Sequence, residues 1–200
     1  MTATTELEAV NIMLASIGES PINSLTGTLP VDAKIAQNTL NEVNKEVQSE
    51  GWHFNTEVDV TLTRDASDNI TLASNTLRVD PNLYDHPTVD AVQIGSKLYD
   101  RKNHKYEFDE DLKCVVVYFR TFTEITEPAR RYVMIKAARI FVDRLVGDEG
   151  LRTFTQQDEV RARSILMETD YSNADHNILR GDPAMADVFA TYSPSDVLLR

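Results

Sequence analysis

Hydrophobic residues in the first third of the chain recur every three or four positions, the spacing of one face of an α-helix. The first such stretch starts with Thr5 and Glu8 at capping-box spacing, stops at Gly18, and has its hydrophobic positions at Leu7, Val10, Leu14 and Ile17. The second has Asp32 as its expected N-cap, stops at Gly51, and has its hydrophobic positions at Ala36, Leu40, Val43 and Val47. The pattern predicts two amphipathic helices joined by the loop SPINSLTGTLP, with Trp52 and Phe54 directly after the second.

From Glu57 the hydrophobic period changes to two, which indicates β-strands. Val58, Val60 and Leu62 alternate with polar residues, and Ile70 with Leu72 repeats the alternation after the turn-like stretch RDASDN, which predicts a hairpin. Further short strands are expected at 76–79, 89–94, 98–99, 105–108 and 113–119. Residues 57–122 are therefore predicted to form a small antiparallel sheet module.

Two more helices are predicted after the strands. Pro128 suits a first helical turn, and the hydrophobic face that follows runs to Gly147 through Tyr132, Ile135, Ala138, Val142 and Leu145. A fourth helix is expected over about 151–170, where charges of both signs surround Leu151, Phe154, Ala162, Ile165 and Leu166.

From about Ser172 the periodicity ends, and Gly181, Pro183 and Pro194 favour an extended arm. The arm keeps seven large apolar residues that it cannot bury by itself: Ile178, Leu179, Val188, Phe189, Val197, Leu198 and Leu199. Two interpretations stay open, a segment that docks onto a neighbouring protein and a frayed terminus.

Together these elements predict an α+β fold. It consists of a four-helix bundle (1–56 and 123–171), a small antiparallel β-sheet module inserted between helices 2 and 3 (57–122), and an extended C-terminal arm (172–200). A chain of 200 residues is long enough to bury one core of its own. We expect the four helices to share that core, with Trp52 and Phe54 at the point where the chain leaves it for the sheet.

The net charge of −12, from 20 basic and 32 acidic residues, predicts that the protein does not bind nucleic acid tightly. Glu6, Glu8, Glu42, Glu46 and Glu50 are expected on exposed helix faces. Residues 128–147 are the exception, with one acid, Asp143, and five bases: Arg130, Arg131, Lys136, Arg139 and Arg144. This basic helix either presents a stripe to a partner or is a solvated face that pairs with acidic neighbours.

Several classes of chemistry find no support in the sequence. The longest uncharged apolar run, 114–119, is far too short to span a membrane, and the acidic N-terminus does not suggest a secretion signal. Cys114 is the single cysteine, so it excludes an intrachain disulfide and is expected in the core. The glycines give no nucleotide-binding pattern, no GxSxG motif is present, and the four histidines are isolated: His53, His86, His104 and His176. We therefore expect no metal and no cofactor.

Paired carboxylates are the remaining catalytic candidates, because hydrolysis of a glycosidic bond requires two acids a short distance apart. Glu57 and Asp59 would lie on one side of a strand, and Asp109, Glu110 and Asp111 cluster at a turn. Trp52, Tyr84, Tyr99 and Tyr106 could stack on sugars. In so acidic a chain such groups also arise as solvated charges of edge strands and turns.

Four segments of the sequence are distinctive in combination: ELEAVNIMLASIGESPINSLTG, NEVNKEVQSEGWHFNTE, RRYVMIKAARIFVDRLVG and HNILRGD. Together they resemble the tail tubular A proteins of short-tailed bacteriophages. The most specific feature is an IGE loop after the first helix combined with a GWxFN turn after the second. The resemblance runs over almost the whole chain and is weakest through 65–127.

The resemblance implies a structural virion protein that is assembled in the host cytoplasm and located in the virion tail. Such a protein forms a dodecameric ring between the portal protein and the tail nozzle protein (tail tubular protein B), holds tail fibre proteins, and lets phage DNA pass without binding it tightly. No membrane partner is implied. The alternative that remains is a virion-associated glycan hydrolase acting on host-surface polysaccharide, as the main or a second activity, and a DNA-binding regulator is disfavoured by the charge.

Overall fold

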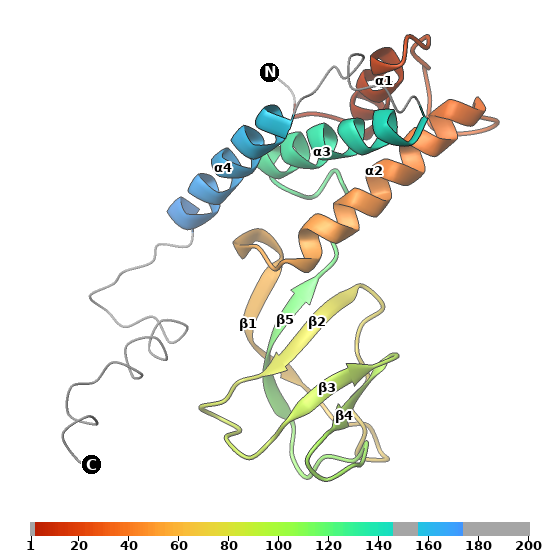
Figure 1. Cartoon of the computed structure of the whole chain (residues 1–200). Helices are drawn as coiled ribbons and strands as arrows, with labels where there is room; N and C mark the ends of the chain where they lie inside the picture. Colours follow the sequence, from red (N-terminus) through yellow and green to blue (C-terminus); the bar gives the residue numbers. More distant parts are fainter. Residues whose placement is uncertain (1–2, 146–155, 174–200) are drawn as a thin grey trace.

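The chain forms two helices, then a set of short antiparallel strands, then two further helices (Figure 1). The computed structural model describes residues 3–145 and 156–173. The helices are α1 (Glu6–Ser16), α2 (Val31–Ser49), α3 (Glu127–Leu145) and α4 (Gln156–Asn173), and a 3-10 turn, η1 (His53–Asn55), follows α2. The strands are β1 (Thr56–Leu62), β2 (Thr76–Pro81), β3 (Ala91–Ile94), β4 (Lys97–Asp100) and β5 (Leu112–Tyr118). This is the mixed α+β class that the sequence predicts.

The starts of the first two helices follow different rules. At α1 the predicted capping box is confirmed, since Glu8 N donates to Thr5 Oγ1 at 3.2 Å and Thr5 N donates to Glu8 Oε2 at 2.8 Å. At α2 the predicted cap is wrong: the N-cap is Pro30, whose carbonyl accepts from Lys34 N at 3.0 Å, and Asp32 lies inside the first turn. An aspartate there still faces the positive end of the helix dipole, which explains why the residue type suited a helix start.

The helices share one hydrophobic core, as expected. α1, α2 and α3 pack against one another and α4 packs on α3, to which it contributes the buried Ala162 and Leu166. Trp52 belongs to this helical core with 7% of its surface exposed, and its indole N–H donates to the Val47 carbonyl at 2.8 Å. Phe54 is partly buried against the same core.

The strands pair differently from the predicted hairpin. β1 pairs with the distant β5 in a sheet of order β1-β5-β2, and its link to the 70–72 segment is an isolated bridge between Arg64 and Ile70. β5 (LKCVVVY) is apolar on both faces, which suits the central position that it takes. The expected strand at 105–108 is also wrong, because Lys105 and Glu107 make only isolated bridges, to Asp100 and to Asn69 respectively.

The strands have a second core of their own. It contains Ile70, Leu72, Val79, Leu98, Phe108, Leu112, Cys114 and Val116. Cys114 is fully buried, as predicted, and burial, with a smaller contribution from Asp80, raises the pKa of its thiol to about 12. The two cores meet at the Gly51–Trp52 corner, where α2 gives way to β1.

Two of the predicted features lie outside the described residues. These are the helix stop at Gly147 and the positions of Leu151 and Phe154. The described part of α4 begins at Gln156 and continues to Asn173, and its Ile165 is 42% exposed. None of the helices within the described ranges is long and apolar enough to cross a membrane.

Replacing Trp52 with alanine should lower the free energy of unfolding by about 3–5 kcal/mol, because it removes a buried indole that the core cannot refill. Denaturant unfolding followed by circular dichroism measures the loss. Tyr84→Ala is the control: Tyr84 is 66% exposed, and its loss should stay within about 0.5 kcal/mol. Equal losses for the two variants would contradict the burial of Trp52.

Cys114 should resist alkylation in the folded protein at a pH of about 9, where an unfolded chain already carries much thiolate. Because folding raises the thiol pKa, its contribution to stability is complete below the unfolded pKa of about 8.5 and is lost as the pH rises toward 12. The rates of iodoacetamide labelling with and without denaturant measure how strongly folding protects the thiol. Equal labelling rates would show that the thiol is exposed in the native state.

Candidate functional site

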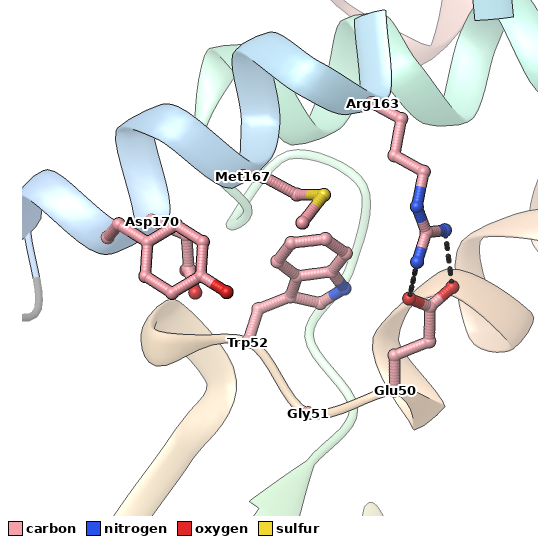
Figure 2. Close-up of a pocket in the computed structure, with 7 residues that line it drawn as sticks. Glu50, Gly51, Trp52, Arg163, Met167 and Asp170 are labelled. Carbon is pink, nitrogen blue, oxygen red and sulfur yellow. Dashed lines mark hydrogen bonds and ion pairs between the residues drawn. The ribbon is translucent and has the colours of Figure 1, made fainter. Parts of the chain in front are cut away.

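The most distinctive local arrangement is the corner between α2 and β1, against which α4 lies (Figure 2). Gly51 has φ +82°, a left-handed conformation that disfavours any side chain, and an added Cβ would lie 2.7 Å from Arg78 Nη2. The glycine turns the chain sharply out of α2, so that Trp52 is directed back into the helical core. The GWxFN sequence therefore encodes a corner.

Asn55 fastens this corner from the inside. It is fully buried; its Oδ1 accepts from Trp52 N at 2.8 Å, and its Nδ2 donates to the carbonyls of Gln48 at 2.9 Å and Tyr118 at 3.0 Å. One side chain thus joins the end of α2 to β5. Hydrophobic periodicity did not predict that Asn55 would connect α2 to β5. The asparagine in the GWxFN turn is the sequence feature that could have indicated it.

Arg163 of α4 closes the corner from the outside. Its guanidinium forms a two-pronged pair with Glu50, Nη1 to Oε1 at 3.0 Å and Nη2 to Oε2 at 2.6 Å. Nη1 also donates to the Tyr132 hydroxyl at 3.1 Å, and the guanidinium lies 5.8 Å from the ring centres of Trp52 and Tyr132. The hydrogen bonds to Glu50 and then Tyr132 raise the pKa of Arg163, so it stays charged.

A recess of about 300 Å³ lies between the corner and α4. Its lining consists of Glu50, Gly51, Trp52, Arg163, Met167, Asp170 and Tyr171 (Figure 2). Asp170 is engaged there, since its Oδ1 accepts from His53 N at 2.9 Å. Arg163 and Glu50 neutralise each other, and the lining includes neither a nucleophile nor any of the carboxylates singled out from the sequence. The arrangement can hold α4 in place.

The basic helix is largely neutralised within the chain. Lys136 pairs with Glu46 at 3.0 Å, Arg144 with Glu42 at 2.7 Å, and Arg139 with Glu159 at 2.6 Å. Arg139 also pairs with Asp143, Arg130 donates to the carbonyls of Thr4, Thr123 and Ile125, and Arg131 is exposed. These contacts favour the interpretation of a paired helix face.

The acidic partners on α2 lie on the surface, as expected. Glu42, Glu46 and Glu50 are exposed, and so is Glu8 of α1. The hydrogen bonds from Arg144 lower the pKa of Glu42. Glu6 differs from the expectation, because it is half-buried and accepts from Gln37 Nε2 at 3.2 Å.

The candidate catalytic carboxylates each contact a different partner. Glu57 pairs with Arg120 at 2.8 Å, while Asp59 lies in a β-bulge at φ +56° and accepts from Asn82. The bulge breaks the strand alternation on which the expected Glu57–Asp59 pairing rests. The turn acids diverge as well: Asp109 pairs with Lys105, Glu110 with His86, and Asp111 with Arg64.

The aromatic residues proposed for stacking are also separated. Trp52 lies in the helical core, Tyr84 is exposed in a loop, and Tyr99 and Tyr106 meet edge to face at 4.9 Å. His86 is buried; its Nε2 accepts from Lys113 N, so its Nδ1 donates to Glu110. No group of three metal-ligating side chains occurs within residues 3–145 and 156–173.

The predicted docking residues of the arm lie outside the described residues. They are Ile178, Leu179, Val188, Phe189, Val197, Leu198 and Leu199, and His176 lies outside as well. Their proposed role therefore depends on the sequence pattern alone.

Two comparisons place the chain among known proteins. A family model described as tail tubular protein matches residues 7–176, which include most of α1, all the strands, and α2 to α4. The chain is also similar to tail tubular protein A of Klebsiella phage KP34, with 28% identity over 166 residues. The aligned region covers 82% of this chain and 86% of that relative. The resemblance noted in the sequence is thereby confirmed.

Replacing Arg163 with lysine should lower the free energy of unfolding by about 1 kcal/mol, because lysine keeps the charge and loses the two-pronged geometry. The size is modest because the Arg163 and Glu50 side chains are 41% and 36% exposed, so solvent screens the pair. Chemical denaturation of Arg163→Lys, Glu50→Gln and the double variant isolates the coupling. Arg161→Lys, at an exposed position of the same helix, is the control, and additive losses would contradict the pair.

Proposed function

We propose, from the premise that this chain belongs to the tail tubular protein family, that it forms the ring adaptor between the portal and the nozzle of a phage tail. Membership of the family establishes a structural role in the tail of a phage. That match is the observation that carries the proposal, because it includes both the helices and the strands instead of one motif. Assembly takes place in the host cytoplasm, before the virion is complete.

The fold supports a ring subunit. Two cores joined at a fastened corner make a rigid wedge, and identical wedges in head-to-tail contact close into a ring when the rotation between them is constant. Tail fibres would attach at the outside of this ring.

The charge supports passage of DNA through the ring. The net charge of −12 repels phosphate. The basic helix is the segment that could have bound DNA, but its Lys136, Arg139 and Arg144 form ion pairs with carboxylates of α2, α3 and α4. A lumen lined by such a surface would not hold DNA tightly during ejection.

The hydrolase alternative is not retained. The family match gives it no support, and its candidate acids Glu57, Asp59, Asp109, Glu110 and Asp111 each bond a separate partner.

The arm from about 172 to 200, whose first two residues the structure places at the end of α4, is proposed as the element that docks onto the portal. Its seven apolar residues follow no period by which the chain could bury them itself, and a ring of arms would add many modest contacts into a strong attachment. The full chain should therefore bind rings of purified portal protein, and native mass spectrometry should show several copies per ring.

The variant Val197→Asp/Leu198→Asp/Leu199→Asp should lose portal binding and keep the melting temperature of the parent. Leu83→Asp, at a loop position that is 61% exposed, is the matched control and should bind as the parent does. Portal binding retained by the arm variant would overturn the docking role of the arm. A parent chain that does not bind portal rings would overturn the adaptor function.

A further inference from the structure

The recess beside the corner leaves apolar side chains of α4 exposed. Figure 2 shows Met167 directed toward the Trp52 ring. Met167 is 37% exposed, and Tyr171, one turn further along α4, is 63% exposed, whereas Trp52 is 7% exposed. The outer face of a surface helix is ordinarily polar. Here that face borders a hollow that an apolar group can fill.

The walls of the recess are fixed before anything fills it. Asn55 holds the corner on one side. On the other side α4 is held by the pair between Arg163 and Glu50 and by the bond from His53 N to Asp170. Filling a preformed recess costs little conformational entropy in its walls. Its volume of about 300 Å³ is at the low end of the roughly 300–1,000 Å³ typical of small-molecule sites, so it suits one or two side chains.

The chain continues from α4 directly beside this recess. α4 ends at Asn173, and residues 174–200 lie outside the described residues. Residues 174–177 (ADHN) are small or polar, and Ile178 and Leu179 are the first large apolar residues that follow. From Asn173 to Ile178 an extended chain reaches about 17 Å. Met167 lies about 9 Å back along the helix axis from Asn173. The chain is therefore long enough to turn around and reach the recess.

Among the seven apolar residues of the arm, Ile178 and Leu179 return to the recess through the shortest loop. Because the entropy cost of closing a loop rises with its length, their return costs less than that of Val188 or Phe189. The arm has no hydrophobic period of its own, so burial of these residues requires a surface from another element. The recess is such a surface within reach.

Charge does not favour the contact. The recess lining includes Glu50, Arg163 and Asp170, and residues 174–182 include Asp175, Arg180 and Asp182, so each side has a net charge of −1. Burial of apolar surface must then supply the free energy of the contact. We therefore expect the contact to persist at high salt, which screens the remaining charges.

We propose that Ile178 and Leu179 pack into this recess of their own subunit, between Trp52 and α4, and so anchor the base of the arm. The inference rests on the proposed function in one respect, since it leaves the distal apolar residues of the arm for the portal. An arm that leaves the subunit from a fixed point loses less conformational entropy when its distal part docks. The anchor itself is a contact within one chain and can be tested without a partner.

Disulfide formation in the full chain tests the anchor. Met167→Cys/Leu179→Cys and Met167→Cys/Ile178→Cys each place one thiol in the recess and one in the arm. At least one of these pairs should form a disulfide within one chain, at low and at high salt, under mild oxidation without denaturant. Cys114 is buried and does not compete. Mass spectrometry after alkylation of the free thiols measures the rate.

The matched controls are Glu168→Cys/Leu179→Cys and Glu168→Cys/Ile178→Cys. Glu168 is exposed on α4 outside the recess lining, and its pairs close loops of nearly the same length. The Met167 pair should react about tenfold or more faster than its control, because a disulfide requires Cα atoms within about 7 Å of each other. Equal rates for both Met167 pairs and their controls would overturn the inference. Disulfides that join two chains instead would assign the recess to the arm of another copy and also overturn it.

The fluorescence of Trp52 gives a second measurement, because it is the single tryptophan of the chain and lines the recess. Ile178→Ser/Leu179→Ser should increase the quenching of this fluorescence by acrylamide, since it uncovers the recess. Val197→Ser/Leu198→Ser is the control and should leave quenching at the parent value. Melting temperatures near that of the parent show that both variants are folded. Equal quenching in the two variants would contradict the anchor.

Portal binding separates this inference from the proposed function. If the parent binds portal rings while no Met167 pair reacts faster than its control, the inference fails and the adaptor function stands. If the parent does not bind portal rings, the adaptor function fails, and the disulfide rates still decide the anchor. Trp52 fluorescence that becomes protected only when portal protein is added would assign the recess to the portal protein and overturn the inference.

Discussion

The left-handed backbone at Gly51 sets the direction in which the chain leaves the helices, and the positions of both cores depend on it. With φ +82°, the chain turns within one residue, so Trp52 enters the helical core while Thr56 begins the sheet. Asn55 then fixes the turn by bonding to Gln48 on one side and Tyr118 on the other. A longer linker would let the two cores move independently, since neither has a large surface that contacts the other. The connection between the two cores is therefore made by a few consecutive residues and the hydrogen bonds of Asn55.

The sequence predicted the features that depend on local periodicity and end signals. The capping box at Thr5, the stop at Gly51, the burial of Trp52 and Cys114, and most of the helix and strand positions follow from neighbours within about one turn or one strand. The pairing of β1 with β5 could not be predicted in this way. It joins residues 50 or more positions apart, such as Thr56 with Val117, and depends on which strand can be apolar on both faces.

At the candidate site, too, local features could be predicted from the sequence and contacts between distant elements could not. The basic residues of α3 were evident as a cluster, but their partners Glu42, Glu46 and Glu159 lie on two other helices. Whether those basic side chains are free or ion-paired depends on tertiary packing, so composition alone could not predict it. The carboxylate candidates are a related case: the bulge at Asp59 changes the side on which a residue points, and an alternating sequence carries no sign of it. Asn55 and Arg163 were missed because their roles depend on contacts with distant elements.

In the proposed ring, the corner would also influence assembly, although its residues need not contact any partner. The hairpin β3–β4 lies far along the sheet from the corner, and α1 lies at the other end of the helices (Figure 1). A small change in the angle at Gly51 would therefore shift one end of the molecule relative to the other by a larger distance. Closure of a ring requires a constant rotation between neighbouring subunits, and head-to-tail contacts with a variable rotation form open chains instead. The pair between Arg163 and Glu50, together with the bond from His53 to Asp170, ties α4 across this corner and restricts the angle. If the chain forms the proposed ring, residues buried at the corner would decide between a ring and a filament while the contact surfaces themselves remain unchanged.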